Sequence, residues 1–285
     1  MRLGVRAVAK ILAVALVVLP LIPLQLLAIR RDWRIAGPIA CFVLRWALLV
    51  MAVRVETVGA PIRDRPLLLV SNHLSWLDIP VIGALMPLSF VAKREVASWP
   101  VFGLLARLKR CVFIDRDRRH RTGAAAKEIG DRLAAGDAIV LFPEGTTSDG
   151  LRVLPFRSAL IGAAREAVGR GDRPVMIQPF AVVYLRRGGL PIGRGAMAEI
   201  AWTGDEDLVP HLLGILNGGP IDAELRFGAP RAFDAATDRK ALSRDLEQEV
   251  RRLMKGRPLS SPSLPDDGAV TVTPPSARDR EPLAG

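Results

Sequence analysis

The first sixty residues are dominated by two long apolar stretches. The first runs from Ile11 to Ile29, 19 residues without a charge. A helix of that length rises about 28 Å, close to the roughly 30 Å of a bilayer core. The second stretch, Ile35 to Val53, is interrupted only by Arg45. We expect both stretches to be helices that form a membrane-embedded hairpin over residues 1–56.

The residues around these stretches leave the depth of the hairpin open. Arginine or lysine stands on both sides of each stretch, so the positive-inside rule has little asymmetry to act on. Pro20 and Pro23 are expected to kink or break a straight spanning helix. No small-residue cleavage site follows the first stretch, which argues against a signal peptide. A hairpin that dips into one leaflet, with both ends at the cytoplasmic face of the inner membrane, fits at least as well as two full spans. The alternative is a buried helical hairpin of a soluble protein.

Short apolar runs alternate with amphipathic segments over residues 57–255. The expected strands are Leu67–Val70, Ser89–Ala92, Cys111–Ile114, Ala138–Phe142, Val175–Val183 and Ile221–Phe227. The expected helices are Ser75–Met86, Trp99–Leu108, Arg119–Ala135, Arg157–Val168 and Thr237–Met254. This alternation predicts an α/β domain with a central, mostly parallel sheet flanked by helices. Residues 256–285 hold six prolines and little periodicity, which predicts a disordered tail.

Composition narrows the class of protein. The chain has 285 residues and is 50% hydrophobic, which excludes disorder of the whole chain. Its 40 Lys and Arg outnumber 29 Asp and Glu, so acidic partners are expected. Nucleic acid is not expected as a partner, because six of the eleven net positive charges lie in residues 1–60 and an aromatic content of 5% is low for base stacking. Cys41 and Cys111 belong to no Cys/His cluster, so no metal site is expected.

The first candidate site follows the strand Leu67–Val70, at the edge where open α/β sheets bind ligands. His73, one of three histidines, stands there five residues before Asp78. A histidine in such a turn can act as a general base, with a carboxylate that orients it and stabilises the imidazolium. The two side chains meet only if His73 precedes the helix, because residues five apart on one helix point about 140° apart. Alternatively, Ser75 and Asp78 have capping-box spacing, and Asp78 then only caps the helix.

The second candidate site follows the strand that ends at Phe142. The segment from Pro143 to Gly150 holds two glycines and three hydroxyl side chains. Such a turn can offer backbone N–H groups and hydroxyls to a polar head group. The alternative is an ordinary solvent-exposed loop.

Taken together, these segments resemble the PlsC-type glycerolipid acyltransferases, the family of 1-acylglycerol-3-phosphate acyltransferases. The resemblance covers roughly residues 60–230. Four blocks of the family are matched in order, namely Asn72-His73-x4-Asp78, Phe113-Ile114-Asp115-Arg116, Phe142-Pro143-Glu144-Gly145-Thr146 and Val175-Met176-Ile177-Gln178-Pro179. Each block falls at a strand end or on a strand of the predicted sheet.

The resemblance implies a membrane-bound O-acyltransferase with no metal or other cofactor. It would move a fatty acyl group from an acyl-carrier-protein or acyl-CoA thioester to the free hydroxyl of a lysolipid in the membrane. His73 would deprotonate that hydroxyl and Asp78 would orient His73. The substrate-binding residues implied are Asn72, Arg116, Glu144, Gly145 and Thr146, and Thr147 follows them in the same loop. Lys93 is a further candidate because it follows a strand end, where its charge could form part of an anion pocket. Two alternatives stay open: a covalent acyl-enzyme on Ser75 or Cys111, and a non-catalytic membrane- or lipid-binding protein.

One departure from the family concerns the acceptor. The third block of the family often continues with an arginine that helps to hold the glycerol phosphate, and this chain has Thr147 there. Loss of a charge-assisted contact weakens the expectation of a phosphate-bearing acceptor. Family members that acylate lyso-ornithine lipid, whose head group is an amino acid, tolerate this change. Residues 142–150 and 202–212 also resemble that branch. We therefore expect either 1-acyl-sn-glycerol-3-phosphate, giving phosphatidic acid, or lyso-ornithine lipid, giving ornithine lipid.

Overall fold

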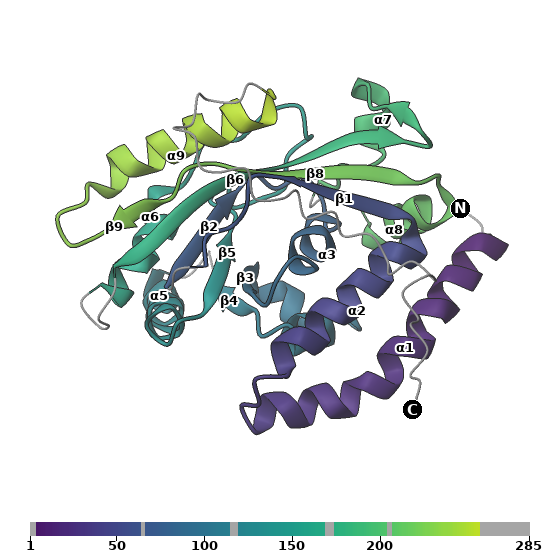
Figure 1. The fold of residues 1–285 in the computed structure, drawn as a ribbon, viewed down its shortest axis with the longest axis horizontal. Helices are drawn as coiled ribbons and strands as arrows, with labels where there is room; N and C mark the ends of the chain where they lie inside the picture. Colours follow the sequence, from purple (N-terminus) through teal and green to yellow (C-terminus); the bar gives the residue numbers. More distant parts are fainter. Residues whose placement is uncertain (1–3, 64–65, 115–118, 169–173, 204–206, 257–285) are drawn as a thin grey trace, which may run out of the picture.

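The computed structural model describes residues 4–63, 66–114, 119–168, 174–203 and 207–256 (Figure 1). Of residues 119–123 it describes the backbone only. The predicted tail beyond Gly256 and the candidate Arg116 lie outside the described residues.

A sheet of nine strands forms the centre of the described part of the molecule (Figure 1). Its order is β1-β8-β6-β2-β5-β3-β4, with β7 and β9 paired to β6. The neighbours β6-β2-β5-β3-β4 are all parallel, and β8 with β1 runs antiparallel to β6. The expected α/β fold with a mostly parallel sheet is confirmed. The strands are β1 Val53–Val58, β2 Leu67–Ser71, β3 Ser89–Lys93, β4 Val112–Ile114, β5 Ala138–Leu141, β6 Val175–Arg187, β7 Leu190–Pro191, β8 Ile221–Phe227 and β9 Arg231–Phe233.

Helices cover both faces of this sheet because its central strands are apolar on both sides. In β2, Leu67 and Leu69 belong to one hydrophobic core, and Leu68 and Val70 belong to the other. The first core is closed by α2 (Ala36–Met51), α3 and α8, and the second by α5, α6 and α9. The short elements are α3 Asp78–Gly83, η1 Arg94–Ser98, α4 Phe102–Leu108, α6 Ser158–Ile161, η2 Gly162–Ala167 and α7 Arg194–Ala198, and the longer ones are α5 Arg119–Ala134, α8 Leu208–Asn217 and α9 Arg239–Met254.

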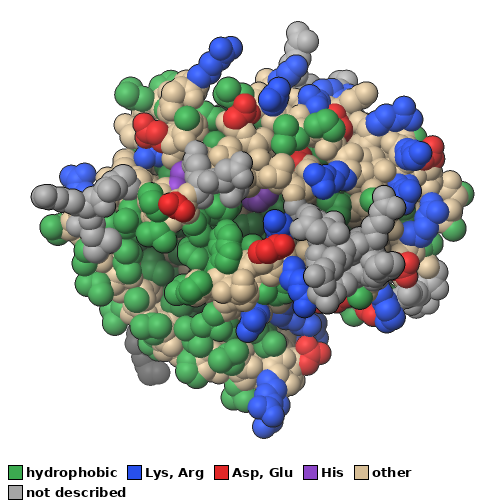
Figure 2. All heavy atoms as spheres, turned by 180° about the vertical axis from the view of Figure 1, so that it is seen from behind, with side chains coloured by type: hydrophobic (Ala, Val, Ile, Leu, Met, Phe, Trp, Pro, Cys, Tyr) green, Lys and Arg blue, Asp and Glu red, His purple; other side chains and the backbone are tan. Residues whose placement is uncertain are grey.

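The expected N-terminal helical hairpin is present as α1 Val5–Arg30 and α2 Ala36–Met51. Helix α1 continues through Pro20 and Pro23 and is bent along its length (Figure 1). By length and composition α1 is apolar enough to cross a membrane, and only 11% of its most apolar window is buried in the protein. Figure 2 shows hydrophobic side chains gathered over the face that carries the hairpin, with histidine side chains visible beside a hollow. The hairpin therefore presents an apolar surface suited to membrane association.

Three differences from the predicted elements have physical causes. Strand β1 is not predicted from the sequence, because its first residue, Val53, is also the last residue of the second apolar stretch. Helix α2 ends just before Ala52, which adopts the left-handed conformation (φ 60°) and turns the chain from α2 into β1. The helix expected at Ser75–Met86 is only Asp78–Gly83, because residues before Asp78 form a turn around its carboxylate. Strand β6 extends beyond Val183, because it pairs with β8 as far as Arg187.

Candidate active site

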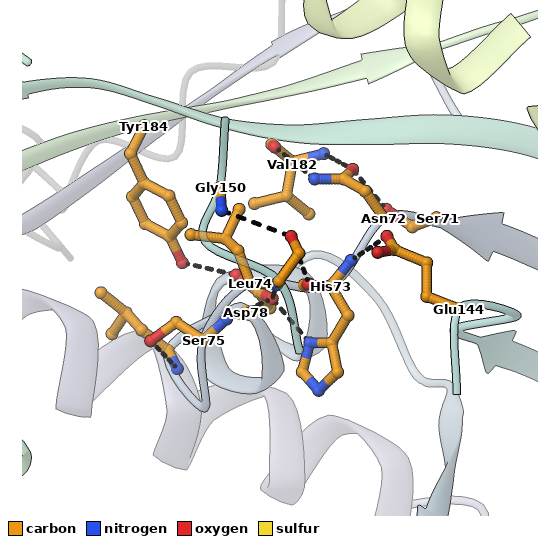
Figure 3. A network of polar contacts seen from close by, with 12 residues as sticks. Ser71, Asn72, His73, Leu74, Ser75, Asp78, Glu144, Gly150, Val182 and Tyr184 are labelled. Carbon is orange, nitrogen blue, oxygen red and sulfur yellow. Dashed lines mark hydrogen bonds and ion pairs between the residues drawn. The ribbon is translucent and has the colours of Figure 1, made fainter. Parts of the chain in front are cut away.

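His73 and Asp78 meet as a hydrogen-bonded pair, with 2.7 Å between His73 Nδ1 and Asp78 Oδ2 (Figure 3). His73 lies in the turn after β2, and Asp78 is the first residue of α3, which is the condition that the sequence set for their contact. The same carboxylate oxygen accepts hydrogen bonds from the backbone N–H groups of Leu74 at 2.8 Å and Ser75 at 3.0 Å. Asp78 therefore orients His73 and also holds the turn before the helix. The capping alternative is wrong, because the N-cap of α3 is Leu77 and makes no side-chain cap hydrogen bond.

Tyr184 is a third member of this network, and it was missed from the sequence. Its hydroxyl donates to Asp78 Oδ1 at 2.9 Å, and the residue is 3% exposed on β6 (Figure 3). Burial, and then the charge of Asp78, raise the pKa of Tyr184 well above its usual value, so the phenol stays protonated as a donor. The only signal in the sequence is that Tyr184 is the single tyrosine of the chain, on the strand that carries the fourth block.

Asp78 fixes which nitrogen of His73 is free to take a proton. The Asp78 carboxylate already accepts three other hydrogen bonds, so it also acts as the acceptor in its contact with His73. The imidazole of His73 therefore carries its proton on Nδ1, and its lone pair is on Nε2. The ring stacks on Phe142 with centroids 4.0 Å apart and planes at 12°. Its side chain is 19% exposed, and Figure 3 shows the second ring nitrogen directed away from Asp78. No hydrogen-bond partner of Nε2 is present among the described residues. This nitrogen is therefore available to a substrate.

The loop after β5 clamps the backbone of His73 from both sides. His73 N–H donates to Glu144 Oε1 at 2.9 Å, and the His73 carbonyl accepts from the Ser148 N–H at 2.9 Å. The other oxygen of Glu144 accepts from Leu154 N–H at 3.0 Å. These contacts form because β2 and β5 are parallel neighbours, so their carboxyl ends lie side by side although His73 and Glu144 are 71 residues apart.

Glu144 is an unusual carboxyl group because it is only 2% exposed. Burial raises the pKa of Glu144 to about 7, against the two backbone hydrogen bonds that favour its charged form. Both of its oxygens are directed at backbone N–H groups. In this structure Glu144 thus joins the first block to the third.

The other predicted binding residues lie at different depths. Asn72 is 1% exposed, and its amide donates to the Val182 carbonyl at 3.0 Å and accepts from the Val182 N–H at 2.9 Å. It therefore joins β2 to β6 behind the pair. Gly145 needs its positive φ of 77°, and a Cβ there would meet Arg157 Nε at 2.9 Å. Thr146 is exposed and Thr147 is half-buried in the same loop.

Lys93 stands at the carboxyl end of β3. Its side chain is 50% exposed, and its ammonium lies 3.8 Å from a carboxylate oxygen of Glu95. A loose, exposed pair of this kind leaves the ammonium free to bind an anion.

The two candidates for a covalent nucleophile are both unsuited to that role. Burial raises the pKa of the Cys111 thiol to about 11, so it is not the thiolate that attacks. Ser75 is fully buried, and its hydroxyl accepts from the Leu77 N–H at 3.3 Å. Among the described residues, no group of three or more His, Cys, Asp or Glu is arranged to hold a metal ion.

Comparison with known proteins agrees with this geometry. Residues 53–183 match the family model described as Acyltransferase. A lyso-ornithine lipid O-acyltransferase of Brucella abortus is 47% identical over 254 residues, which cover 88% of this chain and 94% of that protein. This chain belongs to the PlsC-type acyltransferases. The enzyme class and the family that the sequence predicted are thereby confirmed.

Other relatives of this acyltransferase differ in the acceptor they are named for. A lyso-ornithine lipid O-acyltransferase of Rhizobium meliloti is 42% identical, over 85% of this chain and 83% of that protein. A 1-acyl-sn-glycerol-3-phosphate acyltransferase of Neisseria gonorrhoeae is 30% identical, over 73% of this chain and 77% of that protein. The crystal structure of the 1-acyl-sn-glycerophosphate acyltransferase PlsC from Thermotoga maritima shares the fold, with a TM-score of 0.59 over 88% of this chain and 95% of that one, at 21% identity.

Proposed function

We propose that this acyltransferase transfers a fatty acyl group to the free hydroxyl of lyso-ornithine lipid and so makes ornithine lipid. The donor is an acyl-carrier-protein or acyl-CoA thioester, and the enzyme works at the cytoplasmic face of the inner membrane. The observation that carries the reaction type is Nε2 of His73, which has no hydrogen-bond partner among the described residues. Asp78 holds the ring through Nδ1, and Nε2 is directed away from Asp78.

Each bond change in the transfer has a group to serve it. Nε2 of His73 removes the proton of the acceptor hydroxyl, and the oxygen attacks the carbonyl carbon of the thioester. A carbon–oxygen bond forms, the carbon–sulfur bond breaks, and the sulfur leaves with the proton from Nε2. Asp78 stabilises the imidazolium between these steps. A positioned general base contributes roughly a hundredfold to ten-thousandfold in rate.

The choice of acceptor is supported by relatives and by one residue. The two relatives of 47% and 42% identity are named for lyso-ornithine lipid, whereas the relative named for 1-acyl-sn-glycerol-3-phosphate is 30% identical. Thr147, half-buried in the loop that clamps His73, offers a hydroxyl where the family often has an arginine. A hydroxyl suits a head group without phosphate better than it suits a phosphate, which prefers charged bidentate donors.

The second candidate acceptor is 1-acyl-sn-glycerol-3-phosphate. The exposed ammonium of Lys93, loosely paired with Glu95, favours it because it could neutralise a phosphate. Arg116, by its place in the second block, would assist.

The membrane location is supported by the outward face of α1. Leu12, Leu16 and Leu19 are 64%, 77% and 62% exposed, which in water would leave a large unfavourable apolar surface. Membrane lipid covers such a surface and brings the lysolipid acceptor close to the site.

The test is acyl transfer by the purified full chain in mixed detergent–lipid micelles. Labelled acyl-carrier-protein and acyl-CoA donors are each supplied with a panel of lysolipids, and products are identified by mass spectrometry. We expect ornithine lipid as the main product and loss of more than 99% of turnover in His73→Ala. A His73→Ala variant that keeps several per cent of turnover would show that the base lies elsewhere.

A further inference from the structure

The C-terminal end of the short helix α3 is held by two cations, Arg45 from α2 and Lys109, the residue that follows α4. Lys109 Nζ donates to the Gly83 carbonyl at 3.2 Å. Arg45 Nε donates to the Ala84 carbonyl at 2.8 Å, and Arg45 Nη2 donates to the Leu85 carbonyl at 3.2 Å. The last carbonyls of a helix have no partner within it, and basic side chains can satisfy them. Three consecutive carbonyls at the end of α3 are satisfied in this way.

Arg45 belongs to the membrane hairpin, where it is the single charge of the second apolar stretch. A charge in such a stretch is costly unless its donors find partners. Here the guanidinium is directed at the end of α3, and the helices are in close contact: a Cβ at Gly83 would meet Leu44 Cδ1 at 2.6 Å. The position of Arg45 is therefore explained by a contact with the catalytic domain.

Helix α1 reaches the same point by way of α4. Gln25, 5% exposed and near the C-terminal end of α1, donates from Nε2 to the Leu108 carbonyl at 2.9 Å and to the Ala36 carbonyl at 3.1 Å. Leu108 ends α4, and the next residue is Lys109, which binds Gly83. Each apolar helix of the hairpin thus has one polar side chain directed at this region: Arg45 binds the end of α3 directly, and Gln25 binds the residue before Lys109.

The other end of α3 carries Asp78. With six residues the helix has fewer than two turns, so a displacement at Ala84 moves Asp78 with it. Asp78 in turn sets the tautomer and orientation of His73 across a 2.7 Å contact. A general base displaced by about 1 Å can lose up to a hundredfold in rate.

We infer that Arg45 is a positioning residue, through which the membrane hairpin fixes the helix that carries Asp78. The hairpin then has two roles: it holds the enzyme at the lipid, and it completes the geometry of the His73–Asp78 pair. This second role rests on the proposed function of His73 as the base. It predicts that a change at Arg45 lowers turnover even where access to lipid is unimpaired.

The test compares Arg45→Ala, Arg45→Lys and Arg34→Ala in the full chain. Arg34 is an exposed cation of the same hairpin, and the structure gives it no partner among the described residues, so its removal matches the loss of charge. Sedimentation with anionic phospholipid vesicles reports membrane binding. Mixed micelles that contain lyso-ornithine lipid and 1-acyl-sn-glycerol-3-phosphate give kcat and KM, and circular dichroism reports folding.

We expect every variant to sediment with vesicles and to keep its acceptor KM within about twofold. In Arg45→Ala kcat falls about tenfold, whereas in Arg34→Ala it stays within about twofold. Arg45→Lys lies between them, because one ammonium is a poorer match than the fork of a guanidinium for two carbonyls.

Equal kcat in Arg45→Ala and Arg34→Ala would overturn the inference, and so would a loss confined to membrane binding. If Arg45→Ala does not fold, Arg45→Lys and Arg45→Gln take its place. A wild-type kcat in both of these folded variants would then show that Arg45 is not a positioning residue. His73→Ala in the same assay keeps the two proposals apart. If His73→Ala is active, His73 is not the general base and the proposed function fails. If His73→Ala is inactive but Arg45→Ala has wild-type kcat, only the inference about Arg45 fails.

Discussion

The buried carboxyl group of Glu144 gives a prediction whose sign and size follow from the structure. Burial raises the pKa of Glu144 from 4.5 to about 7. The folded state therefore keeps a proton that the unfolded chain releases. This group contributes most to stability below pH 4.5, and its contribution is lost as the pH rises to 7 and above. With these two pKa values the loss between pH 5 and pH 8 is about 2.5 kcal/mol.

Glu144→Gln removes this titration because an amide is neutral at every pH. It also leaves one oxygen where two backbone donors, His73 N–H and Leu154 N–H, need acceptors. The unmade hydrogen bond costs about 1–3 kcal/mol at any pH. The free energy of unfolding of Glu144→Gln should therefore lie below that of the wild type at pH 5, and the variant should gain about 2.5 kcal/mol on the wild type by pH 8.

The assay is urea unfolding of both proteins in the same detergent at pH 5, 6, 7 and 8. Because all other groups are shared, the difference between the two curves isolates residue 144. Asp149→Asn is the matched control, since Asp149 is an exposed acid in the same loop and its replacement removes the same charged group without removing a support of His73. A difference for Glu144→Gln that stays constant from pH 5 to pH 8 would refute a raised pKa. At every pH we expect turnover at least about tenfold below wild type, because the backbone of His73 loses a support.

Two further predictions concern the pair and its acceptor. Tyr184→Phe removes one of four hydrogen-bond donors to the buried Asp78 and keeps the aromatic ring in the core. We therefore expect kcat/KM to fall about tenfold while vesicle binding is unchanged. An unchanged kcat/KM would mean that the Tyr184 side chain contributes only packing. Thr147→Arg should raise kcat/KM for 1-acyl-sn-glycerol-3-phosphate and leave or reduce it for lyso-ornithine lipid, because an arginine binds phosphate through two hydrogen bonds. A wild-type preference for the phosphate-bearing acceptor that Thr147→Arg does not alter would count against lyso-ornithine lipid as the substrate.

The sequence alone determined most of the strands of the parallel sheet, the longest helices and the two loops that carry the chemistry, but it did not predict β1, α8 or the short elements around them. Buried strands such as Leu67–Ser71 are continuous apolar runs, and helices such as Arg239–Met254 have an apolar face, so local spacing identifies both. The turn with His73 and the loop with Glu144 each follow a strand, and parallel strands place such ends at one edge. The contact of His73 with Asp78 could therefore be stated as a condition before the structure was known.

Only the tertiary structure decided which groups support that contact. Tyr184 reaches Asp78 across 106 residues, and Arg45 reaches the end of α3 across 39, because the order β6-β2-β5 and the packing of α2 on α3 bring them together. The spacing of residues along the chain does not encode which strands become neighbours or which helix end a distant cation will meet. Asn72 shows the same limit, since its amide is committed to Val182 only because β2 lies beside β6. Local periodicity is fixed by backbone geometry within a few residues, whereas these hydrogen bonds exist only once the whole sheet has formed.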